Sequence, residues 1–205
     1  MSESSRRKRL VVLVSGAGTN LQAILDACAA GELRAEVVAV FSDHPNAGGL
    51  GRARQSGVPA LARVKRKSEE RGPYDAALAD EVAGFAPDWV VLAGWMRVFS
   101  RAFLDRFPGR VLNLHPALPG AFPGTHAIER ALDAYRRGAI TATGVMVHLV
   151  PDEGVDSGPV LAQLDVPIEP NDTLDELSAR VHAAEHRLLV DTLKQLVNTP
   201  ASISG

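Results

Sequence analysis

The stretch LVVLVSGAGTN, residues 10–20, decides the expected fold. Residues 10–14 form a continuous apolar run rich in β-branched valine, which is typical of a strand buried on both faces of a parallel sheet. A glycine-rich turn follows, and residues 21–30 then form an apolar helical segment that Gly31 ends. Together these pieces predict the strand, turn and helix that begin a βαβ unit.

The same alternation continues outward along the chain. Further strands are expected at residues 37–41, 59–64, 89–93 and 111–115. One helix is expected directly after the loop at 42–51, and two more are expected at 74–85 and at 100–107. Strands that alternate with helices in this way predict a parallel sheet with right-handed crossovers.

The pattern changes after Pro116. Residues 116–124 are crowded with proline and glycine and predict a shaped loop. A helix at 128–137 and strands at 141–150 and 160–166 follow, and these two strands add an antiparallel edge. A T-x-x-E capping box at Thr173 begins the last helix. The expected fold is α/β: a Rossmann-like, doubly wound, mostly parallel sheet with an antiparallel C-terminal edge.

Length and composition indicate one domain around a sizeable core. The chain has 205 residues, of which 46% are hydrophobic, and we expect a single domain at 9–197 between tails at 1–8 and 198–205. The formal net charge of −2 gives no sign of a nucleic-acid partner. A single cysteine, Cys28, is consistent with a reducing compartment, and no apolar run approaches the ~18–20 residues that span a bilayer. We therefore expect a soluble cytoplasmic protein.

The turn at residues 15–20 is a candidate phosphate site. It lies between a buried strand and a helix, where backbone N–H groups and the helix dipole favour an anion. It is not a complete dinucleotide fingerprint, because Leu21 stands at the third glycine position, and no P-loop lysine follows. The alternative is a tight turn that binds nothing.

Asn113 and His115 form the second candidate. Alternation along the expected strand at 111–115 places both side chains on one face, at the carboxyl end where open α/β sheets bind ligands. An amide can donate to an oxyanion and an imidazole can move a proton near neutral pH. The alternative is a core histidine with satisfied hydrogen bonds.

The connection at 151–159 carries three carboxylates. Asp152 and Glu153 are interpreted as a solvated acidic turn, whereas small residues beside Asp156 permit close approach. A carboxylate next to His115 would orient the imidazole and raise its pKa. His148 receives no role, and we predict no metal site, because the chain has no H-E-x-x-H or comparable ligand pattern.

Four segments, taken in order, resemble one family. They are SGAGTNLQ at 15–22, VLAGWMR at 91–97, LNLHP at 112–116 and GVDSGP at 154–159. The chain is similar in these motifs to the folate-dependent glycinamide ribonucleotide (phosphoribosylglycinamide) formyltransferases of purine biosynthesis, over about residues 10–196. The resemblance implies a formyltransferase fold, 10-formyltetrahydrofolate as co-substrate, no metal, and a monomer or homodimer.

The resemblance also implies roles for individual residues. The matches to catalytic residues are Asn113, His115 and Asp156. The matches to ribonucleotide-binding residues are Gly18, Thr19, Asn20 and Glu185. The matches to folate-binding residues are Arg71, Leu92, Met96, Arg97 and Val98. The loop after His115 departs from the family, because Leu118-Pro119-Gly120 stands where Leu-Leu-Pro is common. His182 receives no role, because members of the family vary at that position.

The implied reaction is direct transfer. The amine of glycinamide ribonucleotide attacks the formyl carbon on N10 of the folate, and a tetrahedral oxyanion forms. Asn113 and protonated His115 stabilise that oxyanion, while Asp156 holds His115 and keeps it charged. The proton passes from the amine to N10 through Asp156, a water molecule or His115, and the sequence does not choose among them.

Several alternatives compete with this interpretation. Formyltetrahydrofolate deformylase carries an additional N-terminal domain and methionyl-tRNA formyltransferase a C-terminal one, and the length of this chain argues against both. A non-catalytic nucleotide- or folate-binding module would not need the Asn113 and His115 pair. A nicotinamide-dependent oxidoreductase is disfavoured by Leu21.

Overall fold

Strand β1 (Lys8–Val14) lies in the middle of a seven-stranded sheet in the computed structural model, which describes residues 6–198. Its apolar residues are fully buried on two sides. Leu10, Val12 and Val14 belong to one hydrophobic cluster, whereas Val11 and Leu13 belong to another on the opposite face. Burial on both faces explains why the strand is continuously apolar.

The remaining strands confirm the expected mixed sheet. They are β2 (Ala35–Ser42), β3 (Ala60–Ala62), β4 (Trp89–Leu92), β5 (Val111–His115), β6 (Ala142–Leu149) and β7 (Val160–Pro167). The order across the sheet is β3-β2-β1-β4-β5-β6-β7. Pairing is parallel from β3 to β5 and antiparallel at β6 and β7, as predicted.

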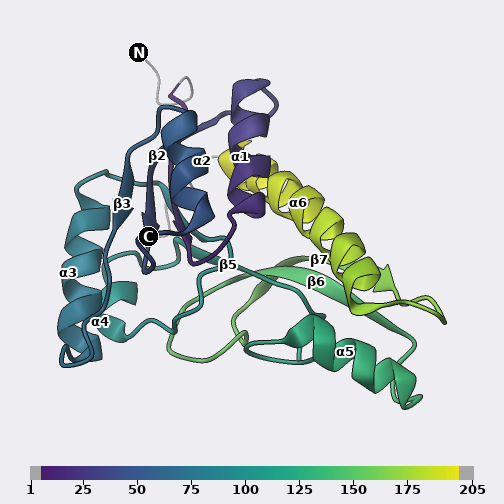
Figure 1. Ribbon diagram of the computed structural model, residues 1–205. Coiled ribbons are helices and arrows are strands. Elements are labelled where there is room, and N and C mark those ends of the chain that lie inside the picture. Colours follow the sequence, from purple (N-terminus) through teal and green to yellow (C-terminus); the bar gives the residue numbers. More distant parts are fainter. Residues whose placement is uncertain (1–5, 199–205) are drawn as a thin grey trace.

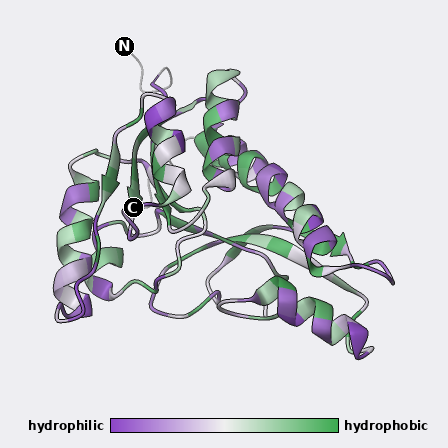
Figure 2. Cartoon of the chain, in the orientation of Figure 1, coloured by the Kyte–Doolittle hydropathy of each residue, from purple (hydrophilic) through white to green (hydrophobic). Residues whose placement is uncertain are grey.

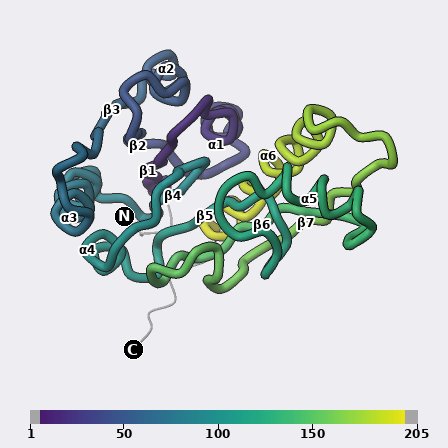
Figure 3. Tube along the Cα trace, turned by 60° about the horizontal axis from the view of Figure 1, so that its bottom comes forward, coloured from purple at the N-terminus to yellow at the C-terminus, as the bar shows by residue number. Residues whose placement is uncertain are grey.

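Helices cover both faces of the sheet. Helices α1 (Thr19–Ala29), α2 (Gly48–Gln55) and α6 (Leu174–Asn198) pack on one face. Helices α3 (Arg71–Ala83) and α4 (Arg101–Leu104) pack on the other, and the two groups lie on opposite sides of the strands in Figure 3. Helix α5 (Ala127–Arg136) joins α6 and β6 in a third cluster. This arrangement is the doubly wound architecture that the sequence predicts.

Helix α6 runs from beside α1 to the end of the molecule that holds β6, β7 and α5 (Figure 1). Its first half packs through Leu177 and Val181 against β6, β7 and α5, and its second half packs through Leu189 and Leu193 against α1 and β1. In Figure 2 the strands consist mostly of hydrophobic residues, whereas hydrophilic and hydrophobic residues alternate along α5 and α6. Leu174, the first residue of the helix, is exposed.

The predicted capping box of α6 is confirmed. The Thr173 hydroxyl accepts a hydrogen bond from the Glu176 backbone N–H at 3.2 Å, and the Glu176 carboxylate accepts one from the Thr173 N–H at 2.9 Å. Each residue thus satisfies a backbone donor that the first helical turn leaves without a partner.

Two helices start three or more residues earlier than the sequence predicts. Helix α2 begins at Gly48, within the loop expected at 42–51. The Gly49 N–H bonds to the Gly16 carbonyl and so holds the helix start against the turn. Glycine is required at 49 because a side chain there would overlap Val14. Helix α3 begins at Arg71, three residues early, with Pro73 in its first turn. Proline is tolerated there because the N–H it lacks has no helical partner.

The boundaries of the expected domain extend slightly. Strand β1 starts at Lys8, and Arg6 pairs with Asp88 at 2.7 Å, so residues of the expected tail at 1–8 join the fold. Residues 1–5 and 199–205 of the expected tails lie outside the described residues. Within residues 6–198, no helix has the length and apolarity needed to cross a membrane.

Candidate active site

Strand β5 brings Asn113 and His115 to the carboxyl edge of the sheet. The two side chains share one face because they are two positions apart on a strand. Strand β4 runs parallel on one side of β5, where Leu92 lies in register with Asn113. Strand β6 runs antiparallel on the other side, where His148 is the register partner of Asn113. The site is therefore built where the parallel half of the sheet meets its antiparallel edge.

Asp156 lies between Asn113 and His115, as the sequence analysis expected. Its Oδ1 accepts a hydrogen bond from the Asn113 Nδ2 at 2.9 Å, and its Oδ2 lies 3.3 Å from the His115 Nδ1. The backbone N–H of Gly124 donates to the same Oδ2 at 2.8 Å. One carboxylate thus joins strand β5 to the loop at 116–126 and to the loop at 151–159. We call Asn113, His115 and Asp156 the polar cluster.

Asp156 has a left-handed backbone conformation and a lowered side-chain pKa. Its φ is +51°, the left-handed region that non-glycine residues rarely adopt. Burial raises the pKa of Asp156, but its contacts with His148, Gly124 and His115 outweigh burial and hold the pKa below its ordinary value. Such strain persists only where surrounding contacts over-determine the conformation, as the four partners of this carboxylate do.

His115 is 4% exposed, and both its ring nitrogens face oxygen atoms. Nδ1 faces Asp156, and Nε2 lies 3.1 Å from the carbonyl of Phe122. Only an imidazolium can donate to both oxygens. Burial nevertheless lowers the pKa of His115 more than Asp156 raises it. The expected effect of Asp156 on His115 is therefore present, but burial outweighs it in the unliganded protein.

His148 belongs to the site although the sequence analysis gave it no role. Its Nδ1 lies 2.8 Å from the Leu149 carbonyl and must donate to it, so the lone pair of Nε2 accepts from the Asn113 Nδ2 at 3.1 Å. Asn113 therefore spends one amide hydrogen on Asp156 and the other on His148. Finding His148 would have required the register of β5 with β6, which no sequence pattern specifies.

The glycine turn has the geometry of an anion site. Gly18 precedes α1 with φ +74°, and a Cβ there would overlap the Cα of Gly49. The Arg52 Nε donates to the Ala17 carbonyl at 2.8 Å and fixes the turn against α2. Thr19 is exposed, whereas the Asn20 Oδ1 is buried without a hydrogen-bond partner among the described residues. An unsatisfied buried acceptor at this turn is consistent with a ligand donor.

Glu185 reaches the site from α6. Its carboxylate is buried and lies 2.6 Å from the Nδ1 of His182. This hydrogen bond raises the pKa of His182. The charge of Glu185 also acts to raise the pKa of His115, so the ribonucleotide-binding candidate on α6 lies within electrostatic reach of the polar cluster.

The folate-binding candidates separate into two groups. Leu92 ends β4 next to Asn113, and Met96, Arg97 and Val98 follow the strand; the Met96 N–H bonds to the Ser15 hydroxyl at 3.0 Å. Met96 is 64% exposed and Val98 is 44% exposed, so this segment presents large apolar side chains to solvent. Arg97 lies over the Tyr74 ring.

Arg71 lies apart from this segment. It stands at the start of α3, where its Nη2 bonds to the Glu153 carboxylate at 3.0 Å. Glu153 is exposed, as the interpretation of a solvated acidic turn expected, but its carboxylate also forms an ion pair with another element, which the sequence did not indicate. Asp152 accepts a hydrogen bond from the N–H of Gly154 within its own turn.

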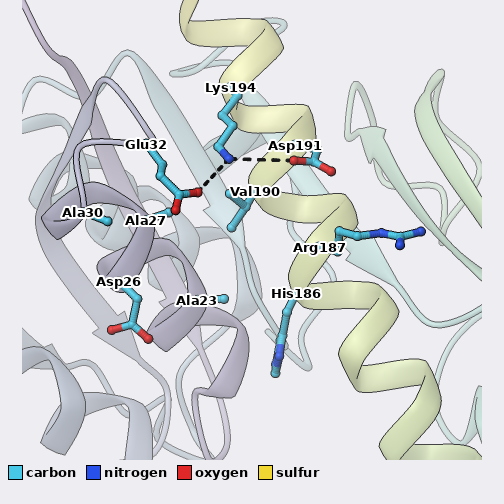
Figure 4. Close-up of a pocket in the computed structure, with 10 residues that line it drawn as sticks. All are labelled: Ala23, Asp26, Ala27, Ala30, Glu32, His186, Arg187, Val190, Asp191 and Lys194. Atoms are coloured by element: carbon cyan, nitrogen blue, oxygen red, sulfur yellow. Dashed lines mark hydrogen bonds and ion pairs between the residues drawn. The ribbon is translucent and has the colours of Figure 1, made fainter.

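A separate hollow of about 450 Å³ lies between α1 and α6 (Figure 4). Lys194 bridges Glu32 and Asp191 along it, and His186 points toward its lower end in this view. None of the candidate site residues lines it. Among residues 6–198, no three His, Cys, Asp or Glu side chains are grouped as metal ligands.

Comparison with known proteins gives a consistent result. The family model for formyl transferases matches residues 8–193. The chain is 44% identical over 200 residues to phosphoribosylglycinamide formyltransferase of Schizosaccharomyces pombe. The alignment covers 92% of this chain and 96% of that protein. It is 43% identical to the trifunctional purine biosynthetic protein adenosine-3 of Drosophila melanogaster over 98% of its own length but spans only 15% of that larger protein.

Solved structures agree with the sequence comparisons. The crystal structure of glycinamide ribonucleotide transformylase 1 from Symbiobacterium toebii superposes with a TM-score of 0.90 at 39% identity. The superposition covers 100% of this chain and 97% of that one. The likeness therefore extends over the whole fold, including the antiparallel edge that supplies Asp156 and His148.

Proposed function

The chain belongs to the formyl transferase family and is a phosphoribosylglycinamide formyltransferase of purine biosynthesis, and from this membership we propose how its residues carry the reaction. The polar cluster transfers the formyl group of 10-formyltetrahydrofolate to the amine of glycinamide ribonucleotide by direct attack. The observation that supports this proposal is the Asp156 carboxylate, which joins Asn113 and His115 at the carboxyl edge of the sheet.

The two substrates approach the polar cluster from different elements. Gly18, Thr19 and Asn20 hold the ribonucleotide phosphate at the start of α1, where the helix dipole and free N–H groups favour an anion. Glu185 holds the rest of the ribonucleotide from α6. The pterin lies against Leu92, Met96, Arg97 and Val98, and the exposed apolar side chains of Met96 and Val98 suit a flat aromatic ring. Arg71 meets the glutamate of the folate.

Formyl transfer requires one bond to form and one to break. The amine nitrogen attacks the formyl carbon, and the π electrons of the C=O bond move to the oxygen, which becomes the oxyanion. The C=O bond then re-forms as the bond from that carbon to N10 breaks. A proton leaves the attacking amine and reaches N10. No side chain becomes acylated, because the substrate amine is the nucleophile. Holding both substrates in line supplies a large part of the acceleration.

His115 and Asn113 stabilise the oxyanion by exchanging partners. The oxyanion takes the place of the Phe122 carbonyl on the Nε2 of His115, and its negative charge adds to that of Asp156 in favouring the imidazolium. Asn113 donates to the oxyanion with a hydrogen that now bonds to Asp156 or His148. Asp156, at a lowered pKa, stays ionised throughout and orients His115. Donors of this kind contribute most when they point at the developing charge.

We further propose that the protein acts in the cytoplasm on these small molecules alone, as a monomer or homodimer, without a metal, a nucleic acid or a membrane. Its single cysteine is consistent with that compartment.

An absorbance assay of formyl transfer tests the proposal. The donor is 10-formyltetrahydrofolate or its dideaza analogue, measured with and without glycinamide ribonucleotide. Donor consumption that depends on the ribonucleotide supports the transferase. Consumption without the ribonucleotide indicates a deformylase, and no consumption in either case contradicts the proposed activity.

A further inference from the structure

Glu153 connects three elements that are distant in sequence. Its Oε2 accepts a hydrogen bond from the Arg71 Nη2 of α3 at 3.0 Å. Its Oε1 accepts one from the backbone N–H of Arg101, the first residue of α4, at 3.1 Å. The two partners lie 82 and 52 residues away along the chain. A carboxylate with two donors from two helices is fixed more firmly than one in a solvated turn.

The partners of Glu153 are themselves held rigidly. Asp75 of α3 is buried and accepts hydrogen bonds from the N–H and the hydroxyl of Ser100, both at 2.7 Å, immediately before α4. Phe99 and Phe103 stack at 3.8 Å on either side of that start. Helices α3 and α4 share one hydrophobic cluster with β1 and β4. Helices α3 and α4 are therefore packed in a fixed position against the sheet.

The other end of the same loop carries Asp156. Only two residues separate it from Glu153, and one of them, Val155, is exposed and packs into no cluster. Asp156 must keep a left-handed φ while it holds Asn113, His115 and Gly124. The position of the loop is thus defined by contacts of Glu153 at one end and of Asp156 at the other.

We propose that Glu153 is a positioning residue of this site: it fastens the loop at 151–159 to α3 and α4, so that the Asp156 carboxylate stays between Asn113 and His115. The effect on turnover rests on the proposed function, whereas the effect on the loop does not. Glu153 touches no reacting atom; its influence on kcat passes through Asp156, whereas its ion pair with Arg71 bears on folate binding.

Steady-state kinetics of two variants and one control test this role. In Glu153→Ala both contacts are lost, and we expect kcat to fall by about five- to tenfold, as misplacement of a catalytic group by a fraction of an ångström implies. The KM for glycinamide ribonucleotide should stay within about twofold, since its binding residues lie on α1 and α6. Glu153→Gln keeps an oxygen for the Arg101 N–H and should recover part of the loss.

Asp152→Asn is the matched control. It changes the neighbouring carboxylate of the same loop, whose bond from the Gly154 N–H the asparagine oxygen preserves. Its kcat should equal that of the unmodified protein. An equal loss in Asp152→Asn and Glu153→Ala would indicate a general effect of loop charge and would overturn the proposal.

A second measurement is independent of turnover. The imidazole of His115, assigned with a His115→Asn variant, is titrated by NMR. Asp156 raises the pKa of His115, so release of the loop in Glu153→Ala should lower that pKa further. An unchanged pKa in Glu153→Ala overturns the proposal, whether or not kcat falls. A lowered pKa in a protein whose unmodified form shows no formyl transfer would instead overturn the proposed function alone.

Discussion

Asp156 holds together groups from three separate segments with one carboxylate. Replacing it with asparagine keeps the shape but removes the charge that orients His115 and favours its protonation. We expect Asp156→Asn to lower kcat by about 10²–10³, the usual effect of removing one group that stabilises an oxyanion. Circular dichroism should show an unchanged fold. Near-normal turnover of a folded Asp156→Asn variant would contradict the assignment of this residue to the reaction.

His115 should make stability depend on pH. Its pKa in the folded protein lies below 6.5, chiefly because of burial. Between that pKa and 6.5 the unfolded chain binds more protons than the folded one, so the free energy of unfolding falls as pH falls through this window. Denaturant unfolding over about pH 5–8 should show a shallower decrease for His115→Asn than for the unmodified protein.

His182 provides the opposite case. Its hydrogen bond with Glu185 raises the pKa of the folded state, so its contribution to stability is present below 6.5 and is lost as pH rises through the folded pKa. His182→Asn should therefore reduce stability at acidic pH and matter less at alkaline pH. The same pH dependence in both histidine variants would show that neither shift is as described.

Single residues were predictable from sequence only where local spacing constrains them. The i, i+2 spacing of Asn113 and His115 on a strand required a shared face, and the structure has it. His148 and Glu153 were missed because their partners lie on another strand and on other helices, and those pairings arise from tertiary packing. The raising effect of Asp156 on the pKa of His115 was expected, but the larger lowering effect of burial was not, since burial cannot be measured from a residue's neighbours in sequence.

The turn between β1 and α1 depends on glycine at one position and not at another. A side chain at Gly18 would overlap the backbone of Gly49 and would have to adopt φ +74°, whereas nothing lies within 4 Å of a Cβ at Gly16. We expect Gly18→Ala to lower the free energy of unfolding by about 1–2 kcal/mol or more and to raise the KM for the ribonucleotide. Gly16→Ala is the control, and equal effects in both variants would refute this account.

Elements were predicted well where their own residues decide them. Strand β5 has the predicted bounds, because a buried strand is recognisable from its apolar run. Helix α6 begins at the predicted capping box. The start of α2 was missed because two glycines are poor helix formers, and the helix forms there through contact with the turn at Gly16.

Across the whole molecule, α6 should carry much of the stability. Leu193 is fully buried in the cluster that includes α1 and β1. Leu193→Ala should reduce the free energy of unfolding by about 2–5 kcal/mol, the range for a leucine truncated in a packed core. Leu174→Ala, at the exposed start of the same helix, should change it by less than about 0.5 kcal/mol. Similar losses in equilibrium unfolding would show that α6 does not complete this core.

The position of α6 also bears on synthesis of the chain. Strand β1 and helix α1 leave the ribosome well before α6, the helix that covers their shared hydrophobic face. Until α6 is made, the nascent chain exposes a hydrophobic surface rich in leucine and valine. Such surfaces are bound by chaperones and promote aggregation. Glu185 lies on the same helix, so the element that covers this face of the core also supplies a candidate substrate-binding residue.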